Sequence, residues 1–162
     1  MKKKYSENIY LIFLFLFAFV FNFYVASKGV LPIDTFLHYD SASRILNGLV
    51  PVRDYWVVHG VTLDYFQALF FLIFGVNWSS YILHSSIFNA LISITTFIYF
   101  LKIGLKKEYS IFLSLSFSVL AYPISGTPFI DQHAIFLSLF AFYFFYFGIK
   151  DNLKYLFFVP LL

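Results

Sequence analysis

The chain alternates between long apolar runs and short polar segments. Apolar runs cover about 9–26, 78–101, 109–124 and 133–149, and another begins at Tyr155. About 20 apolar residues are enough for a helix to span the hydrocarbon layer of a bilayer. We therefore predict four complete crossings and the start of a fifth. Since the last run stops without a polar flank, we expect residues 1–162 to be one transmembrane domain at the N-terminal end of a longer chain.

The first apolar run has two interpretations. It follows Lys2-Lys3-Lys4 and ends in small residues near Ala26, which is also the pattern of a cleaved signal peptide. The run is longer than the roughly 7–15-residue apolar core of such peptides. At about 1.5 Å of rise per residue it just reaches across the bilayer. This favours an uncleaved first helix.

A polar segment at 27–77 separates the first two crossings. Within it we expect helices at about 34–47 and about 62–76. The apolar stretch Tyr65–Val76 would be only about 18 Å long as a helix, well short of the hydrocarbon layer. We therefore expect the second of these helices to lie in the membrane interface.

The basic residues predict which side of the membrane this segment faces. If Tyr65–Val76 does not cross, eight of the eleven basic residues share one side with the N-terminus. Only Lys28, Arg44 and Arg53 then face the other side, and a crossing at Tyr65–Val76 would reverse the count. Because Lys and Arg concentrate in short cytoplasmic loops, we expect a cytoplasmic N-terminus and an outer segment at 27–77.

Composition agrees with a chain that faces lipid. Hydrophobic residues make up 61% of the sequence and charged residues only 12%, against about a quarter charged in soluble domains. Without cysteine there is no disulfide and no thiolate metal site, and no basic patch indicates a nucleic-acid partner. The predicted fold class is all-α transmembrane, a polytopic helical membrane protein with a long outer loop containing juxtamembrane helices.

Five carboxylates map to the predicted outer side: Asp34, Asp40, Asp54, Asp64 and Asp131. A carboxylate beside an apolar boundary is costly unless it is paired, hydrated or functional. The outer face is therefore the expected working face.

Structural roles compete with functional ones at these positions. Asp34 and Asp131 each stand where they could cap a helix N-terminus, and Gly48 suits a helix end. Asp40 is an i,i+4 partner for Arg44. Arg53 and Asp54 could neutralise each other, while His59 with Asp54 could equally bind a metal or a phosphate.

Several polar residues recur at helical spacing inside the apolar runs. Interhelical hydrogen bonds are the usual role of such residues in membranes. We expect that role for Ser85, Asn89, Ser93, Thr96, Ser110, Ser114 and Ser118. His84 lies near the outer end of its run, and we interpret it as structural.

The order of motifs in the outer segment resembles a known family. "IDTFLHYDSASRILNG" followed by "PVRDYWVVHG" resembles the N-terminal portion of polytopic C-type membrane glycosyltransferases, the protein O-mannosyltransferase-like and aminoarabinose-transferase-like enzymes. These have an acid after the first helix, a Tyr and an Arg in a short helix ending at Gly, an Asp-aromatic pair and a His turn. The matching positions are Asp34, Tyr39, Arg44, Gly48, Asp54-Tyr55 and His59. Thr35 stands where the family often has a second acid.

The resemblance implies a transferase at the non-cytoplasmic face of a bacterial inner membrane. It would move a sugar from a polyprenyl-phosphate donor to a glycan, lipid or protein acceptor, with Asp34 as general base. Candidates for the donor phosphate are Arg44, Arg53, Asp54, His59, Asp131 and His133. A divalent metal is an open option, for which Asp54 and His59 are weak candidates.

Two other functions stay open on the residues alone. One is a transporter or channel fragment, which would place ionisable residues near the middle of the bilayer. The predicted crossings carry Ser, Thr and Asn there but no acid or base. The other is a small membrane scaffold subunit without catalysis, for which the outer carboxylates would be incidental.

Overall fold

The computed structural model describes residues 2–29, 35–121 and 126–161, and it confirms the all-α fold class. No strand occurs in these ranges, where an isolated bridge joins Pro51 and Tyr55. The helices are α1 Lys2–Ala26, α2 Thr35–Leu46, α3 Thr62–Phe74, α4 Trp78–Lys102, α5 Lys107–Leu120, α6 Ile130–Lys150 and the 3₁₀ helix η1 Leu153–Leu161.

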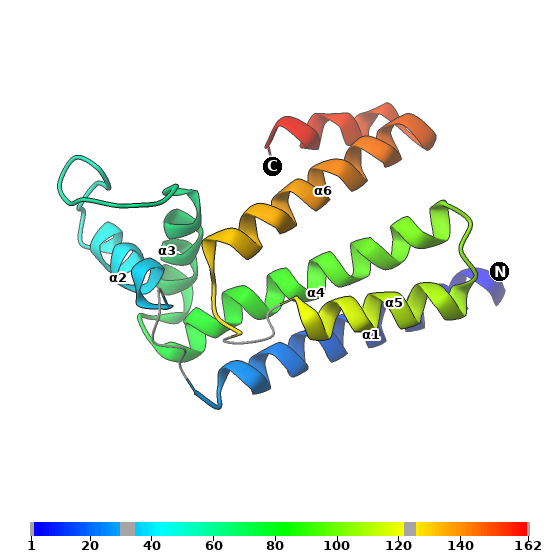
Figure 1. The fold of residues 1–162 in the computed structure, drawn as a ribbon, viewed down its shortest axis with the longest axis horizontal. Helices are drawn as coiled ribbons and strands as arrows, with labels where there is room; N and C mark the ends of the chain where they lie inside the picture. The colour runs from blue at the N-terminus through cyan, green and yellow to red at the C-terminus, as the bar shows by residue number, and fades with distance from the viewer. Residues whose placement is uncertain (1, 30–34, 122–125, 162) are drawn as a thin grey trace.

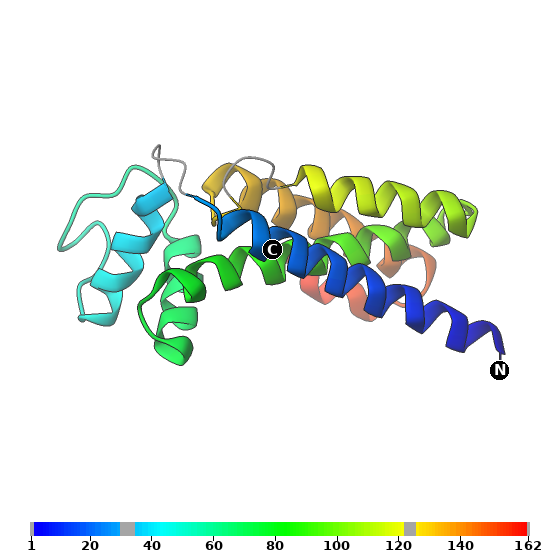
Figure 2. The same ribbon diagram turned by 90° about the horizontal axis from the view of Figure 1, so that it is seen from below.

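Four helices, α1, α4, α5 and α6, lie alongside one another (Figures 1 and 2). The two short helices α2 and α3 lie together at one end of this group. α4 packs on α1, α5 and α6, and α3 packs on both α2 and α4. The start of α6 lies at the α2–α3 end, whereas the N-terminus of α1 and the α4–α5 connection lie at the opposite end.

Among the described residues, three helices are long and apolar enough to cross a bilayer, namely Asn8–Ala26, α4 and α6. α3 has 13 residues and is about 20 Å long, too short to cross. α5 has 14 described residues, about 21 Å. The crossing predicted at 109–124 continues into residues outside the described ranges, so it stays a prediction.

The segment after α6 differs in form from the helix expected to begin at Tyr155. It is the 3₁₀ helix η1, which turns back and packs along α6. Gly148 permits this close approach, because a Cβ at that position would collide with the side chain of Leu156. In the same region Lys102 forms an ion pair with Asp151, which ties the end of α4 to the end of α6.

Buried polar side chains join the long helices, as predicted for Asn89 and Thr96. Asn89 donates to the carbonyls of Ala18 and Ser118, and Thr96 bonds with the Tyr143 hydroxyl at 3.1 Å. Asn22 of α1 forms further interhelical hydrogen bonds, which were not predicted from the sequence. Its Nδ2 lies 3.0–3.2 Å from the hydroxyls of Ser85 and Ser86 and from the Gly126 carbonyl.

Other buried serines do not bond across helices, so the prediction was wrong for them. The hydroxyls of Ser93, Ser110 and Ser118 donate to carbonyls of their own helices or helix ends. A serine hydroxyl can reach the carbonyl one turn back, which competes with partners on other helices. Ser114 is buried with no hydrogen-bond partner among the described residues. These small residues still lie buried where α4 and α5 pack.

Candidate functional site

The juxtamembrane pair α2 and α3 is held together by one face of α2. His38, Ser41 and Ala42 are buried on it, at i, i+3 and i+4. Ala42 packs in a cluster with Ala68 and Phe71 of α3. This packing directs the polar side chains of the same face, His38 and Ser41, towards the first turn of α3.

Asp64, in that first turn, is completely buried and has three side-chain partners. His38 Nδ1 lies 2.7 Å from one carboxylate oxygen, and Ser41 Oγ donates to the other at 2.7 Å. His59 Nε2 lies 3.0 and 3.1 Å from the two oxygens. We call these four residues the Asp64 cluster.

Two opposing effects act on the pKa of Asp64. Burial raises it, but the hydrogen bonds from His38, Ser41 and His59 together outweigh burial and hold it below its ordinary value. A carboxylate that accepts several hydrogen bonds is stabilised in its charged form. Asp64 is therefore a buried anion at neutral pH.

A cavity of about 110 Å³ adjoins the Asp64 cluster. Its polar lining consists of Asp40, Ser41, Tyr55 and His59, and Trp56 is among its apolar neighbours. The Tyr55 hydroxyl lies 2.7 Å from Ser41 Oγ, and burial raises its pKa, so the phenol stays protonated. Ser41 and His59 both line the cavity and contact Asp64, which links the buried anion to this opening.

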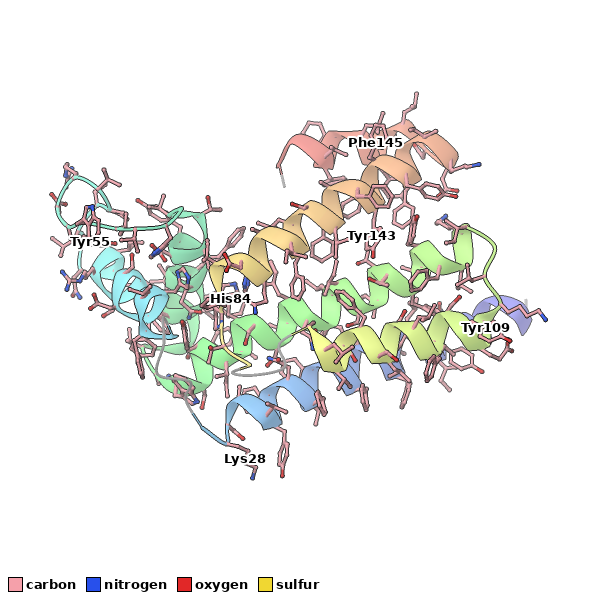
Figure 3. All side chains as sticks on the ribbon, viewed as in Figure 1. Lys28, Tyr55, His84, Tyr109, Tyr143 and Phe145 are labelled. Carbon is pink, nitrogen blue, oxygen red and sulfur yellow. The ribbon has the colours of Figure 1, made fainter. Side chains whose placement is uncertain are left out.

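The remaining two histidines of the chain lie one helical turn further along α3, beside Gln67. His84 Nδ1 bonds with Gln67 Oε1 at 2.9 Å, and the rings of His84 and His133 are 4.9 Å apart. All three side chains are buried, and Figure 3 shows His84 where α4 meets the start of α6. Asp64 and Gln67 are one helical turn apart on α3. Asp64 contacts His38 and His59, and Gln67 contacts His84. The fourth histidine, His133, contacts the ring of His84.

The arginine candidates form the ion pairs that their spacing predicts. Arg44 bonds with Asp40 at 2.8 Å, and its guanidinium lies over the Tyr55 ring at 5.3 Å. Arg53 pairs with Asp54 at 2.7 Å. Asp54 also accepts the Val50 N–H, and the two partners lower its pKa to about 2. Both pairs lie on exposed surface.

Asp131 does not cap α6, so that prediction was wrong. The N-cap position is Phe129, without a side-chain cap, and Asp131 lies exposed within the first turn. The helix begins earlier than the apolar run suggested, and a carboxylate in the first turn is still favoured by the helix dipole. Neither Asp54 nor Asp131 lines the cavity beside the Asp64 cluster. Asp34, the predicted base or N-cap, lies outside the described residues.

Sequence reasoning assigned no role to His38 and grouped Asp64 only with the outer acids. The sequence nevertheless contains a pattern that indicates a role for both residues. One face of the helix, at i, i+3, i+4 and i+7, contains His38, Ser41, Ala42 and Ile45. Because two of these side chains are polar, a polar partner is expected where this face packs on another helix. Asp64 is the acid nearest to the start of the next helix.

In the structure His59 contacts Asp64, whereas the metal site suggested by the sequence combined His59 with Asp54. Asp54 is occupied by Arg53. The ligand atoms of His38, His59 and Asp64 all lie within 4.8 Å of one another, so this set could hold a metal ion. Two imidazoles and a carboxylate are a frequent donor set for divalent transition metals.

Comparison of the chain with protein-family models, curated proteins and solved structures gives no match. The fold and the three candidate spans therefore define its class, which is that of an all-α membrane protein.

Proposed function

We propose that the chain belongs to a membrane glycosyltransferase that moves a sugar from a polyprenyl-phosphate donor to an acceptor hydroxyl at the non-cytoplasmic face. The observation that carries this proposal is a juxtaposition in space. Tyr55 and His59, two positions of the family resemblance, line one cavity at the α2–α3 end, and Arg44 lies over the Tyr55 ring. Asp34 directly precedes α2.

The chemistry requires a base, a place for a phosphate and access from the bilayer. The acceptor oxygen attacks the anomeric carbon, the bond from that carbon to the phosphate oxygen breaks, and the phosphate leaves with the electron pair. Asp34 takes the hydroxyl proton. Arg44 and Arg53, both exposed at this end, are the groups suited to the phosphate charge.

A donor of this kind keeps its lipid tail in the membrane, and the apolar surface of this end supports that requirement. α3 exposes Leu69, Leu72 and Ile73, and Trp56 is 85% exposed beside the cavity. Aromatic residues of this type favour the membrane–water boundary. In our proposal the N-terminus is cytoplasmic and the membrane is a bacterial inner membrane.

The test uses the full-length protein in liposomes with undecaprenyl-phosphate glucose or undecaprenyl-phosphate aminoarabinose as donor. Free undecaprenyl phosphate, released by transfer to any acceptor hydroxyl, is measured by mass spectrometry. We expect release by the wild type and loss of release in Asp34→Asn at unchanged membrane abundance. Glu108→Gln, at the opposite end, is the matched control and should stay active. Equal release by Asp34→Asn would refute the role of Asp34, and no release by the wild type from either donor would favour the transporter or scaffold alternatives.

A further inference from the structure

We propose that His38, His59 and Asp64 form a binding site for one divalent zinc-type cation at the α2–α3 end of the protein. The proposed site is independent of glycosyl transfer. Its failure would leave the proposed function standing, and the reverse also holds.

Three separate segments bring the ligands to one point. His38 comes from the middle of α2, His59 from the loop after Tyr55, and Asp64 from the first turn of α3. Both imidazoles direct a nitrogen at the same carboxylate, at 2.7 Å for His38 Nδ1 and 3.0 Å for His59 Nε2. The two rings meet edge to face with centroids 4.4 Å apart, which fixes their orientation. A single ion can therefore reach all three.

Charge is the second argument. Asp64 is fully buried, and the side chains bonded to it in the described part of the chain are two histidines and a serine. Desolvation of a buried carboxylate costs several kcal/mol; the hydrogen bonds of the cluster already offset this cost, and a cation bound beside the carboxylate would stabilise it further. The two arginines of this end are bonded to Asp40 and Asp54 on exposed surface. A divalent cation bound by the cluster would therefore meet a carboxylate that carries no arginine or lysine partner among the described residues.

The donor set selects the kind of cation. Imidazole nitrogens suit zinc and its first-row neighbours, whereas magnesium and calcium prefer oxygen ligands. Three protein ligands with room for water are the pattern of an open zinc site. With ligands at about 2.1 Å, tetrahedral donor atoms lie about 3.4 Å apart. The nitrogen–oxygen spacings of 2.7 Å for His38 and 3.0 Å for His59 are about 0.4–0.7 Å shorter, so binding requires both imidazoles to move away from the carboxylate by that amount.

The cavity supplies the entry path and the open position. His59 and Ser41 line it, and Ser41 Oγ lies 2.7 Å both from Asp64 and from the Tyr55 hydroxyl. These hydroxyls could hold a water molecule on the cavity side of the ion. The structure thus contains the ligands, a buried anion and the access that a cation site needs.

The test measures metal content in full-length protein purified in detergent through a tag without histidine. The protein is stripped with a chelator, incubated with Zn²⁺, freed of excess ion and analysed by mass spectrometry for zinc per chain. We expect about one zinc in the wild type and in Glu108→Gln, an exposed acidic position at the opposite end of the molecule that does not line the cavity. We expect the buffer background in His59→Gln and in His38→Gln.

A second measurement covers the case of a variant that fails to fold. Co²⁺ added to the stripped wild type should give the visible absorption bands of a tetrahedral site, and Zn²⁺ should abolish them. Zinc retained by the double variant His38→Gln/His59→Gln, or a wild type with no zinc above background and no cobalt spectrum, would overturn the proposal. The last result would leave the Asp64 cluster as a hydrogen-bonded group only.

Discussion

At the scale of the residue, Asp64 is a fully buried carboxylate held by three side chains. It is an anion removed from water, and its partners come from α2 and from the loop before α3. Removing one partner of a buried charged group costs far more than removing an exposed pair, because the remaining groups are left unsatisfied. The cluster therefore fixes α2, the loop and α3 relative to one another.

The first prediction concerns Asp64→Asn. The amide leaves the surrounding donors of His38 and Ser41 poorly matched, and we expect a loss of about 3 kcal/mol of stability. Asp40→Asn, which breaks the exposed Arg44 pair, should cost less than about 1 kcal/mol. Thermal unfolding in detergent compares the two variants. Equal small effects would show that the Asp64 cluster does not stabilise the α2–α3 pair.

The second prediction concerns pH. The folded-state pKa of Asp64 lies below its ordinary value, which is near 3.9 in an unfolded chain. Its stabilisation is therefore complete above about pH 4 and is lost as the pH falls through the lower pKa of the folded state. In chelator, the difference in unfolding temperature between wild type and Asp64→Asn should shrink as the pH falls below about pH 4. A difference that grows as the pH falls below about pH 4 would contradict the lowered pKa.

At the scale of the element, the apolar runs identified the helices well, but they did not identify buried faces. The helices expected at about 34–47 and 62–76 correspond to α2 and α3. Within α2, the apolar residues Phe36 and Leu37 are exposed. The buried face carries His38 and Ser41 instead.

The physical reason is the solvent. In water, apolar periodicity marks the inside of a protein, but lipid accepts apolar side chains on the outside, and polar groups must turn inward. The same reversal explains Asn22, whose hydrogen bonds to α4 could not be located from a run of apolar neighbours. Long-range partners such as Asp64 with His38 leave no trace in local spacing.

The third prediction concerns the contact between Gly126 and the end of α1. Gly126 has φ +65°, and a Cβ there would lie 2.6 Å from Ala26 Cβ and 2.9 Å from its backbone nitrogen. Gly126→Ala combines backbone strain with this collision, and we expect a loss of about 2–4 kcal/mol. Alanine substitutions at Gly104 and Gly60, measured in the same thermal assay, distinguish the cost of backbone strain from the cost of the collision.

Gly104 has φ +92° with open space around it, so Gly104→Ala should show the strain alone, about 1–2 kcal/mol. Gly60 has neither feature, and Gly60→Ala should be nearly neutral. If Gly126→Ala were no worse than Gly104→Ala, the packing of the segment at 126 on α1 would differ from that described.

At the scale of the whole molecule, the two ends of the helical array differ in chemistry. The α2–α3 end carries the Asp64 cluster, the cavity and the start of α6. The opposite end carries the α4–α5 connection with Lys102, Lys106 and Lys107, and the end of α6 with Lys150. In Figure 3, Tyr55 and Tyr109 mark these opposite ends. The account depends on the two ends facing opposite sides of one membrane.

Impermeant maleimide labelling of single-cysteine variants tests this most directly, because the natural chain has no cysteine. Trp56→Cys in the exposed loop and Asp131→Cys at the start of α6 are compared with Glu108→Cys at the start of α5, all three positions being exposed. In intact bacterial cells we predict that positions 56 and 131 react and that position 108 reacts only after lysis. Reaction of 56 and 131 from opposite sides of the membrane would contradict the account.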